Sequence, residues 1–177
     1  MDGFEEKTIS SRNIYSGRIV SLREDTVKMP SGKTAWREVV EHKGAVAVIA
    51  LSAPDEIVLI RQFRKPVAAV IYEIPAGLFH DSETLEAAAR RELQEETGYV
   101  AGKIRQVMEA YTSPGYSNEI LYYFLAEDLK LTQQNLDEDE LVKVECVKID
   151  AALKMVKDGI IKDNKTIIGV MIAARFM

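Results

Sequence analysis

The sequence predicts an α+β fold in which helices pack on a mixed β-sheet. Strand-like and helix-like segments follow one another without the regular alternation that marks a parallel α/β fold. Hydrophobic residues make up 47% of the chain and charged residues 29%, a balance typical of a globular protein. The length of 177 residues suits one domain with a small appendage.

The first half of the chain predicts mainly strands. These are expected at residues 7–9, 19–28, 34–41, 44–51 and 57–60. Pro30 and Gly32 indicate a turn between the second and third strands, and Pro54 indicates one before the last. The run GAVAVIAL at 44–51 is apolar on both faces, which is typical of a buried central strand.

The second half mixes helices and strands. A loop is expected after residues 75–77, followed by a helix at 85–97 with Thr84 as its N-cap and Gly98 just beyond its end. The remaining expected elements are strands at 104–111, 119–125 and 142–149 and helices at 151–157 and 165–176, the first of these helices ended by Gly159.

Composition excludes several classes of partner and site. The net charge of −5 argues against a nucleic-acid backbone or an anionic membrane as the main partner. No segment approaches the ~20 apolar residues of a membrane span, and the acidic N-terminus does not resemble a signal peptide. Cys146 is the single cysteine, so an intramolecular disulfide is impossible, and we expect it to be a small buried hydrophobe. A cytoplasmic location is the simplest expectation.

The helix at 85–97 concentrates acidic residues. Leu85, Ala89 and Leu93 recur at i, i+4 and i+8 and form an apolar stripe. Glu92 and Glu96 lie along that stripe, and Glu95 lies beside them, so three carboxylates share one patch. Such an oxygen-rich patch suits Mg²⁺, which is bound through carboxylates and substrate phosphates. A solvated helix face is the alternative that the helix alone leaves open.

Residues 77–99 read GLFHDSETLEAAARRELQEETGY and match the signature G-x5-E-x7-R-E-U-x-E-E-x-G-U, where U is an apolar residue. Tyr99 is a tolerable final apolar residue. On this motif the chain resembles the Nudix hydrolases, which cleave nucleoside diphosphates linked to another moiety. The resemblance implies a loop–helix–loop catalytic element on an α/β/α sandwich with a mixed sheet.

The resemblance also implies roles for the residues of the motif. Glu92 and Glu96 would be metal ligands with the Ala76 carbonyl, and Glu95 would be a ligand or lie close to the ligands. Gly77 and Gly98 would serve backbone conformation, while Glu83 and Arg91 would hold the loop to the helix. Two or three Mg²⁺ ions per site are implied, with Mn²⁺ as the other possible ion.

Three flanking features resemble the ADP-ribose pyrophosphatase branch. The run EIPAG at 73–77 leads into the motif, and Pro114 follows Tyr99 by fifteen positions. The stretches RQFR at 61–64 and WREV at 36–39 resemble segments that reach substrate in that branch. The resemblance therefore implies hydrolysis of ADP-ribose to AMP and ribose 5-phosphate.

Substrate contacts are predicted outside the motif. Arg37 and Arg64 would bind the two phosphates, and Glu119 would accept hydrogen bonds from a ribose. Adenine would stack on an aromatic ring, with Trp36 as one candidate; the others are Phe4, Tyr15, Tyr111 and Tyr116. Surface charge for the arginines and a plain turn for Pro114 remain open as alternatives.

The acidic run at 136–141 falls where this branch carries a catalytic glutamate. We favour Glu140 as the base that deprotonates the attacking water, with Glu138 next. The same run also fits a solvated loop. Rival functions are a Nudix pyrophosphatase for another sugar nucleotide, NADH or FAD, and a module that binds ADP-ribose without cleaving it.

Residues 1–42 precede the motif-bearing domain at 43–177. In the ADP-ribose branch such β extensions pair or swap between subunits, and one subunit completes the site of the other. We therefore expect the extension to be a dimerisation element and the protein to be a homodimer acting on a small nucleoside diphosphate sugar.

Overall fold

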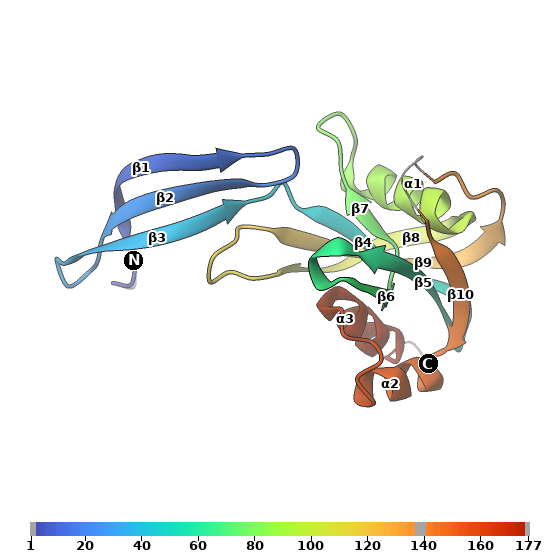
Figure 1. Ribbon diagram of the computed structural model, residues 1–177. Coiled ribbons are helices and arrows are strands. Elements are labelled where there is room, and N and C mark those ends of the chain that lie inside the picture. The colour runs from blue at the N-terminus through green and yellow to red at the C-terminus, as the bar shows by residue number, and fades with distance from the viewer. Residues whose placement is uncertain (1–2, 137–140, 176–177) are drawn as a thin grey trace. The chain divides into compact units, whose positions relative to one another are not determined.

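The computed structural model describes residues 3–136 and 141–175 (Figure 1). The chain forms two compact units. The first comprises Met1–Gly44 with Tyr111–Ile120, and the second comprises Ala45–Ala110 with Leu121–Met177.

The first unit is built on a three-stranded antiparallel sheet of β1 (Lys7–Ser16), β2 (Ser21–Lys28) and β3 (Thr34–Glu41). The end of β3 is joined by the segment 111–120. Val40 N donates to Tyr116 O at 2.7 Å, and Asn118 N donates to Val40 O at 3.3 Å. This segment carries Pro114 and Glu119, so the unit gathers four of the predicted substrate residues.

The second unit contains a seven-stranded mixed sheet with the order β10-β5-β4-β9-β8, in which β6 pairs with β5 and β7 pairs with β4. Its strands are β4 (Ala45–Ala53), β5 (Glu56–Arg64), β6 (Ala69–Glu73), β7 (Ala76–Leu78), β8 (Tyr99–Tyr111), β9 (Ile120–Leu131) and β10 (Lys143–Lys148). β4 and β9 run parallel, while β5, β6, β7 and β10 make antiparallel pairs. The mixed sheet predicted from the sequence is confirmed.

The central strand β4 separates two hydrophobic cores. Its alternate residues Ala47 and Ile49 pack with buried side chains of α2 (Ile149–Lys157) and α3 (Asn164–Ala173). Val46 and Val48 point the other way and pack with Ala88, Ala89 and Leu93 of α1 (Leu85–Thr97). Because successive side chains of a strand face opposite sides, one apolar run fills both layers. The result is the expected sandwich, with α1 on one face and α2 and α3 on the other (Figure 1).

Most predicted elements are present with shifted ends. The largest extension is β1, which continues to Ser16 rather than ending at residue 9, and β8 begins at Tyr99 rather than 104. The last helix ends at Ala173 instead of 176, and α2 begins at Ile149. In the described part of the chain no helix is long and apolar enough to cross a membrane.

Two features of the local structure differ from what the sequence predicted. The strand β7 (Ala76–Leu78) was not predicted, and its residues Ala76 and Gly77 pair with Ala47 and Val46 of β4. Cys146 is exposed rather than buried, because it lies on β10 at the sheet edge, and its sulfur is 3.6 Å from the Tyr99 hydroxyl.

Candidate active site

Helix α1 begins and ends as the sequence predicts. The Thr84 side chain accepts a hydrogen bond from Ala87 N at 3.1 Å, which caps the first turn. Gly98 has a φ of 75°, and its N–H donates to Gln94 O at 2.8 Å, which ends the helix in the left-handed conformation that glycine tolerates best. These caps set the two ends of α1.

Glu96 is the acidic residue of α1 that lies deepest in the protein. It is 3% exposed, and its Oε2 accepts a hydrogen bond from Ala76 N at 2.8 Å. Ala76 is in turn paired with Ala47 of β4. The carboxylate of Glu96 is therefore hydrogen-bonded to the backbone of Ala76, and both residues are candidate metal ligands.

Glu92 lies over the next residue of β7, Gly77. A Cβ atom added to Gly77 would come within 2.2 Å of the Glu92 carboxylate. We expected Gly77 to serve backbone conformation, but it is not among the glycines of the described chain with positive φ. In this structure the absence of a Cβ atom at Gly77 leaves room for the Glu92 carboxylate. Gly98 does have the positive φ that we expected.

Arg91 connects the acidic residues of the motif. Its guanidinium donates to Glu83 at 2.8 Å, to Glu92 at 2.7 Å and to Glu95 at 2.9 Å, and it also donates to Leu78 O at 2.9 Å. The hydrogen bond from Arg91 holds the pKa of Glu83 below its usual range, and the same bond is the main reason why the pKa of Arg91 is raised. Arg91 thus ties the loop before α1 to the helix and balances part of its negative charge.

Glu95 lies at the rim of this cluster. Its side chain is 36% exposed, and together with Arg91 it borders a hollow of about 430 Å³. The hollow is also lined by Gln94, Gln133 and Asn135. Asn135 N donates to Glu95 O at 3.1 Å, so the segment after β9 is attached to the C-terminal end of α1.

Arg64, predicted to bind phosphate, makes a bidentate pair with Glu73. Its Nε and Nη2 donate to the Glu73 carboxylate at 2.7 and 2.9 Å. Glu73 is 1% exposed and also accepts a hydrogen bond from Lys165 of α3. Sequence reasoning noted Glu73 only as part of the EIPAG run and missed Lys165, because no local pattern marks a lysine at the start of a helix as the partner of a residue 92 positions away.

In the first unit, Arg37 and Glu119 also have protein partners. Arg37 donates to both carboxylate oxygens of Glu6, and to Trp36 O at 2.8 Å. Glu119 accepts a hydrogen bond from the Thr112 hydroxyl at 2.8 Å, and its other carboxylate oxygen lies 3.4 Å from His42 Nδ1. The segment 111–120 and the end of β3 therefore share a polar cluster.

Trp36 and Pro114 are surface residues of the first unit. The Trp36 side chain is 76% exposed, and Pro114 lies in the turn between β8 and β9. The candidate bases Glu138 and Glu140 lie outside the described residues. Among the described residues, the carboxylate cluster and Arg64 thus lie in the second unit, and the other substrate candidates lie in the first.

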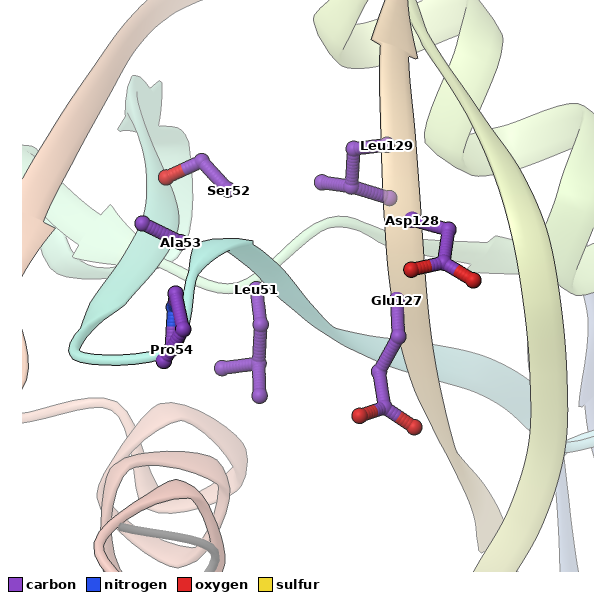
Figure 2. A pocket seen from close by; sticks show the side chains of 7 residues that line it. All are labelled: Leu51, Ser52, Ala53, Pro54, Glu127, Asp128 and Leu129. Atoms are coloured by element: carbon purple, nitrogen blue, oxygen red, sulfur yellow. The ribbon is translucent and has the colours of Figure 1, made fainter.

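A second hollow, of about 310 Å³, lies between the β4–β5 turn and β9 (Figure 2). It is lined by Leu51, Ser52, Ala53, Pro54, Glu127, Asp128 and Leu129. Asp128 pairs with Lys103 at 2.9 Å, and none of the predicted site residues borders this hollow. The carboxylate cluster of α1 is therefore the stronger candidate for the active site.

Comparison with known proteins agrees with this fold and cluster. Residues 41–167 match the NUDIX domain, and residues 6–40 match the nucleoside diphosphate sugar hydrolase N-terminal domain. The chain therefore belongs to the Nudix family and is a pyrophosphohydrolase. Members of this family generally use divalent metal ions.

Among individual proteins, the chain is 45% identical to the ADP-ribose pyrophosphatase of Bacillus subtilis (strain 168), over 94% of this chain and 91% of the relative. It is 44% identical to the methanol dehydrogenase activator of Bacillus methanolicus, with the same coverage. The crystal structure of an ADP compounds hydrolase has the same fold, with a TM-score of 0.86 and 18% identity over 97% of this chain and 94% of that chain.

A substitution at Gly77 tests the close approach of Glu92. We expect Gly77→Ala to lower kcat about 100-fold, because the new methyl group displaces the carboxylate of a candidate ligand. The fold should survive, since the atoms that must move are the end of a flexible side chain. Activity would be measured alongside the melting temperature, and a fully active Gly77→Ala protein would show that the position of Glu92 does not matter.

Proposed function

We propose that this protein hydrolyses the pyrophosphate of ADP-ribose to AMP and ribose 5-phosphate. The observation that carries the proposal is the placement of two carboxylates, Glu92 and Glu96, on the Ala76–Gly77 peptide segment. The 45% identity to an ADP-ribose pyrophosphatase supports the choice of substrate. A module that only binds ADP-ribose has no need for this cluster of carboxylates.

The donor set suits a hard divalent cation. In the described part of the chain no group of three or more His, Cys, Asp or Glu side chains forms a metal cage. Two carboxylates and a backbone carbonyl match the way Mg²⁺ is bound, with few protein ligands, several waters and substrate phosphates. Glu92, Glu96 and the Ala76 carbonyl would hold two or three Mg²⁺ ions, with Glu95 as a ligand or neighbour; Mn²⁺ would fit the same oxygens.

When bound, the cation supplies charge neutralisation at the pyrophosphate and lowers the pKa of a coordinated water. The chain supplies positioning and proton transfer. Glu140, or Glu138 in its place, takes the proton of the attacking water, whose oxygen ends on one phosphorus as the bond to the bridging oxygen breaks. Arg91 holds Glu92 and Glu95 in place through hydrogen bonds.

The arginines are proposed to bind the phosphates. Arg64 engages Glu73 through Nε and Nη2, so a phosphate oxygen bound by Nη1 leaves that pair intact. Arg37 would either leave Glu6 to bind a substrate phosphate or bind the phosphate while it remains paired with Glu6. Glu119 would accept a hydrogen bond from a ribose hydroxyl, and Trp36, with its exposed ring, would stack on adenine beside Pro114.

The test is a direct assay of ADP-ribose cleavage. With Mg²⁺ we expect AMP and ribose 5-phosphate in equal amounts, and with excess EDTA we expect no cleavage until Mg²⁺ or Mn²⁺ is restored. The same assay with GDP-mannose, NADH and FAD measures specificity. A kcat/KM about tenfold higher for another substrate would reassign the protein within its family.

We further propose that residues 1–42 form a dimerisation element and that the protein is a homodimer in the cytoplasm. All ten residues of β1 are exposed, among them Ile9, Ile14 and Tyr15, and in β1–β3 only Asp25 and Val27 are buried. A three-stranded sheet with so little core needs a further layer for stability. Light scattering should give a mass of twice 19.8 kDa, and a value of 19.8 kDa would refute the dimer.

A second candidate function follows from the 44% identity to a methanol dehydrogenase activator. We propose that the hydrolase also raises the activity of a methanol dehydrogenase. The dehydrogenase would be assayed with the wild type and with Glu96→Gln. Stimulation by the wild type alone would link activation to the carboxylate cluster, and absence of stimulation by either protein would remove this candidate.

A further inference from the structure

The first turn of α3 holds the segment that leads into the candidate metal site. Lys165 Nζ donates to the buried carboxylate of Glu73, and Thr166 Oγ1 accepts a hydrogen bond from Ile74 N at 2.8 Å. A Cβ added to Gly169 of the same helix would lie 3.0 Å from the Ile74 side chain. Three positions of α3 therefore lie against Glu73 and Ile74, which precede Pro75 and Ala76.

The next residues of this segment are held equally closely. Pro75 O accepts a hydrogen bond from Val48 N at 2.8 Å, and Ala76 N donates to Glu96 at 2.8 Å. Each residue from 73 to 76 thus has a partner in a neighbouring element. Glu73 and Ile74 are bonded to α3, Pro75 to β4, and Ala76 to Glu96 of α1. These contacts leave the backbone of residues 73–76 little freedom to adjust. We therefore expect a displacement of Glu73 or Ile74 to displace Ala76 as well.

Lys165 itself is fixed at this position. It is 9% exposed, and Asp163, the N-cap of α3, lies 3.1 Å from its ammonium group. Asp163 also accepts hydrogen bonds from Thr166 N and from Thr166 Oγ1, at 2.9 and 2.6 Å. The helix cap, the lysine and the threonine form one network, which joins the start of α3 to Glu73 and Ile74.

The network also lies close to the negative charge of Glu96 on α1. Arg64, the other partner of Glu73, has a raised pKa, chiefly because of its hydrogen bond to Glu73 and also because of the charges of Glu96 and Asp163. Lys165 and Arg64 share Oε2 of Glu73 as an acceptor. Replacing Lys165 with an apolar residue therefore removes a positive charge near the candidate cation site.

We propose that Lys165 is a positioning residue for the metal site, acting through Glu73 and the 73–77 segment to hold the Ala76 carbonyl and the Glu96 carboxylate toward one cation. The inference rests on the proposed function, because it takes Ala76 and Glu96 as ligands. Lys165 does not touch the cation or the substrate in this role. Outer partners of this kind tune metal affinity by fixing the ligands.

The direction in which cation affinity changes when Lys165 is replaced separates three roles for this residue. Loss of positioning weakens cation binding, whereas loss of a nearby positive charge alone strengthens it. A role in stability alone leaves the affinity of the folded protein unchanged. The dissociation constant for Mn²⁺, measured without substrate by the electron paramagnetic resonance signal of free Mn²⁺, therefore decides among them.

We expect Lys165→Met to bind Mn²⁺ about tenfold more weakly than the wild type, at a temperature where both are folded. Thr166→Val, which removes the acceptor of Ile74 N without any change of charge, should weaken binding in the same direction. The control is Ile149→Ala, which removes a buried side chain of α2 outside the network and should lower the melting temperature with Mn²⁺ affinity unchanged.

Unchanged or tighter Mn²⁺ binding by Lys165→Met would overturn the proposal. If that variant does not fold, unchanged affinity in Thr166→Val overturns it instead. A wild type that binds no Mn²⁺ would refute both this inference and the metal-dependent function. A wild type that binds Mn²⁺ but does not cleave ADP-ribose would refute the proposed substrate alone, because the affinities of the variants would still judge the role of Lys165.

Discussion

Glu96→Gln should lower kcat for ADP-ribose by about 10³-fold or more, since a carboxylate ligand contributes several kcal/mol to transition-state stabilisation and about 1.4 kcal/mol corresponds to tenfold. The glutamine keeps the shape of the side chain, and its carbonyl oxygen can still accept the hydrogen bond from Ala76 N that Glu96 accepts at 2.8 Å. The fold should therefore persist while the negative charge is lost.

The matched control is Glu86→Gln on the same helix. Its side chain is 54% exposed and pairs with Arg90, so the same chemical change should alter kcat less than twofold, as expected for a surface ion pair. Steady-state kinetics at saturating Mg²⁺ and the melting temperature would be recorded for both variants. Near-normal turnover by Glu96→Gln would remove this residue from the metal site.

The parts of the site that sequence could predict are those built from local contacts. The caps Thr84 and Gly98 act within one turn of the helix that they end, so their chemistry is readable from neighbouring positions. The spacing of Glu92 and Glu96 places them on one face of any helix. Arg91 reaches Glu95 by the same i,i+4 rule, which the structure confirms at 2.9 Å.

The parts that could not be predicted depend on how distant segments meet. The bidentate pair of Arg64 with Glu73 is one example, because Glu73 lies opposite Ile60 rather than Arg64 in the β5–β6 pairing and only the side chains meet. The strand β7 is three residues long and includes Gly77, so neither length nor propensity indicates it. Cys146 was misjudged because its run of apolar neighbours does not reveal that β10 is an edge strand.

Loss of the buried carboxylate of Glu73 should strongly destabilise the second unit. Glu73→Gln leaves Lys165 and Arg64 without the charge that both contact, and breaking a buried ion pair from one side costs about 3–5 kcal/mol. We expect the melting temperature to fall by roughly 10 °C, at 2–4 °C per kcal/mol for a chain of this length. Asp55→Asn, which breaks the exposed pair with Lys148, should cost less than about 1 kcal/mol.

The loss caused by Glu73→Gln should depend on pH in a defined direction. Burial raises the pKa of Glu73, but the hydrogen bond from Arg64 and the charge of Lys165 outweigh it, and the net pKa lies below its usual range. A carboxyl whose folded pKa is depressed contributes its stability above its unfolded pKa of about 4.3, and this contribution disappears as pH falls through the folded value. The difference in unfolding free energy between wild type and Glu73→Gln, measured in urea, should be full at neutral pH and narrow below pH ~4. A difference that stays constant or widens on acidification would show that Glu73 is not held ionised by Arg64 and Lys165.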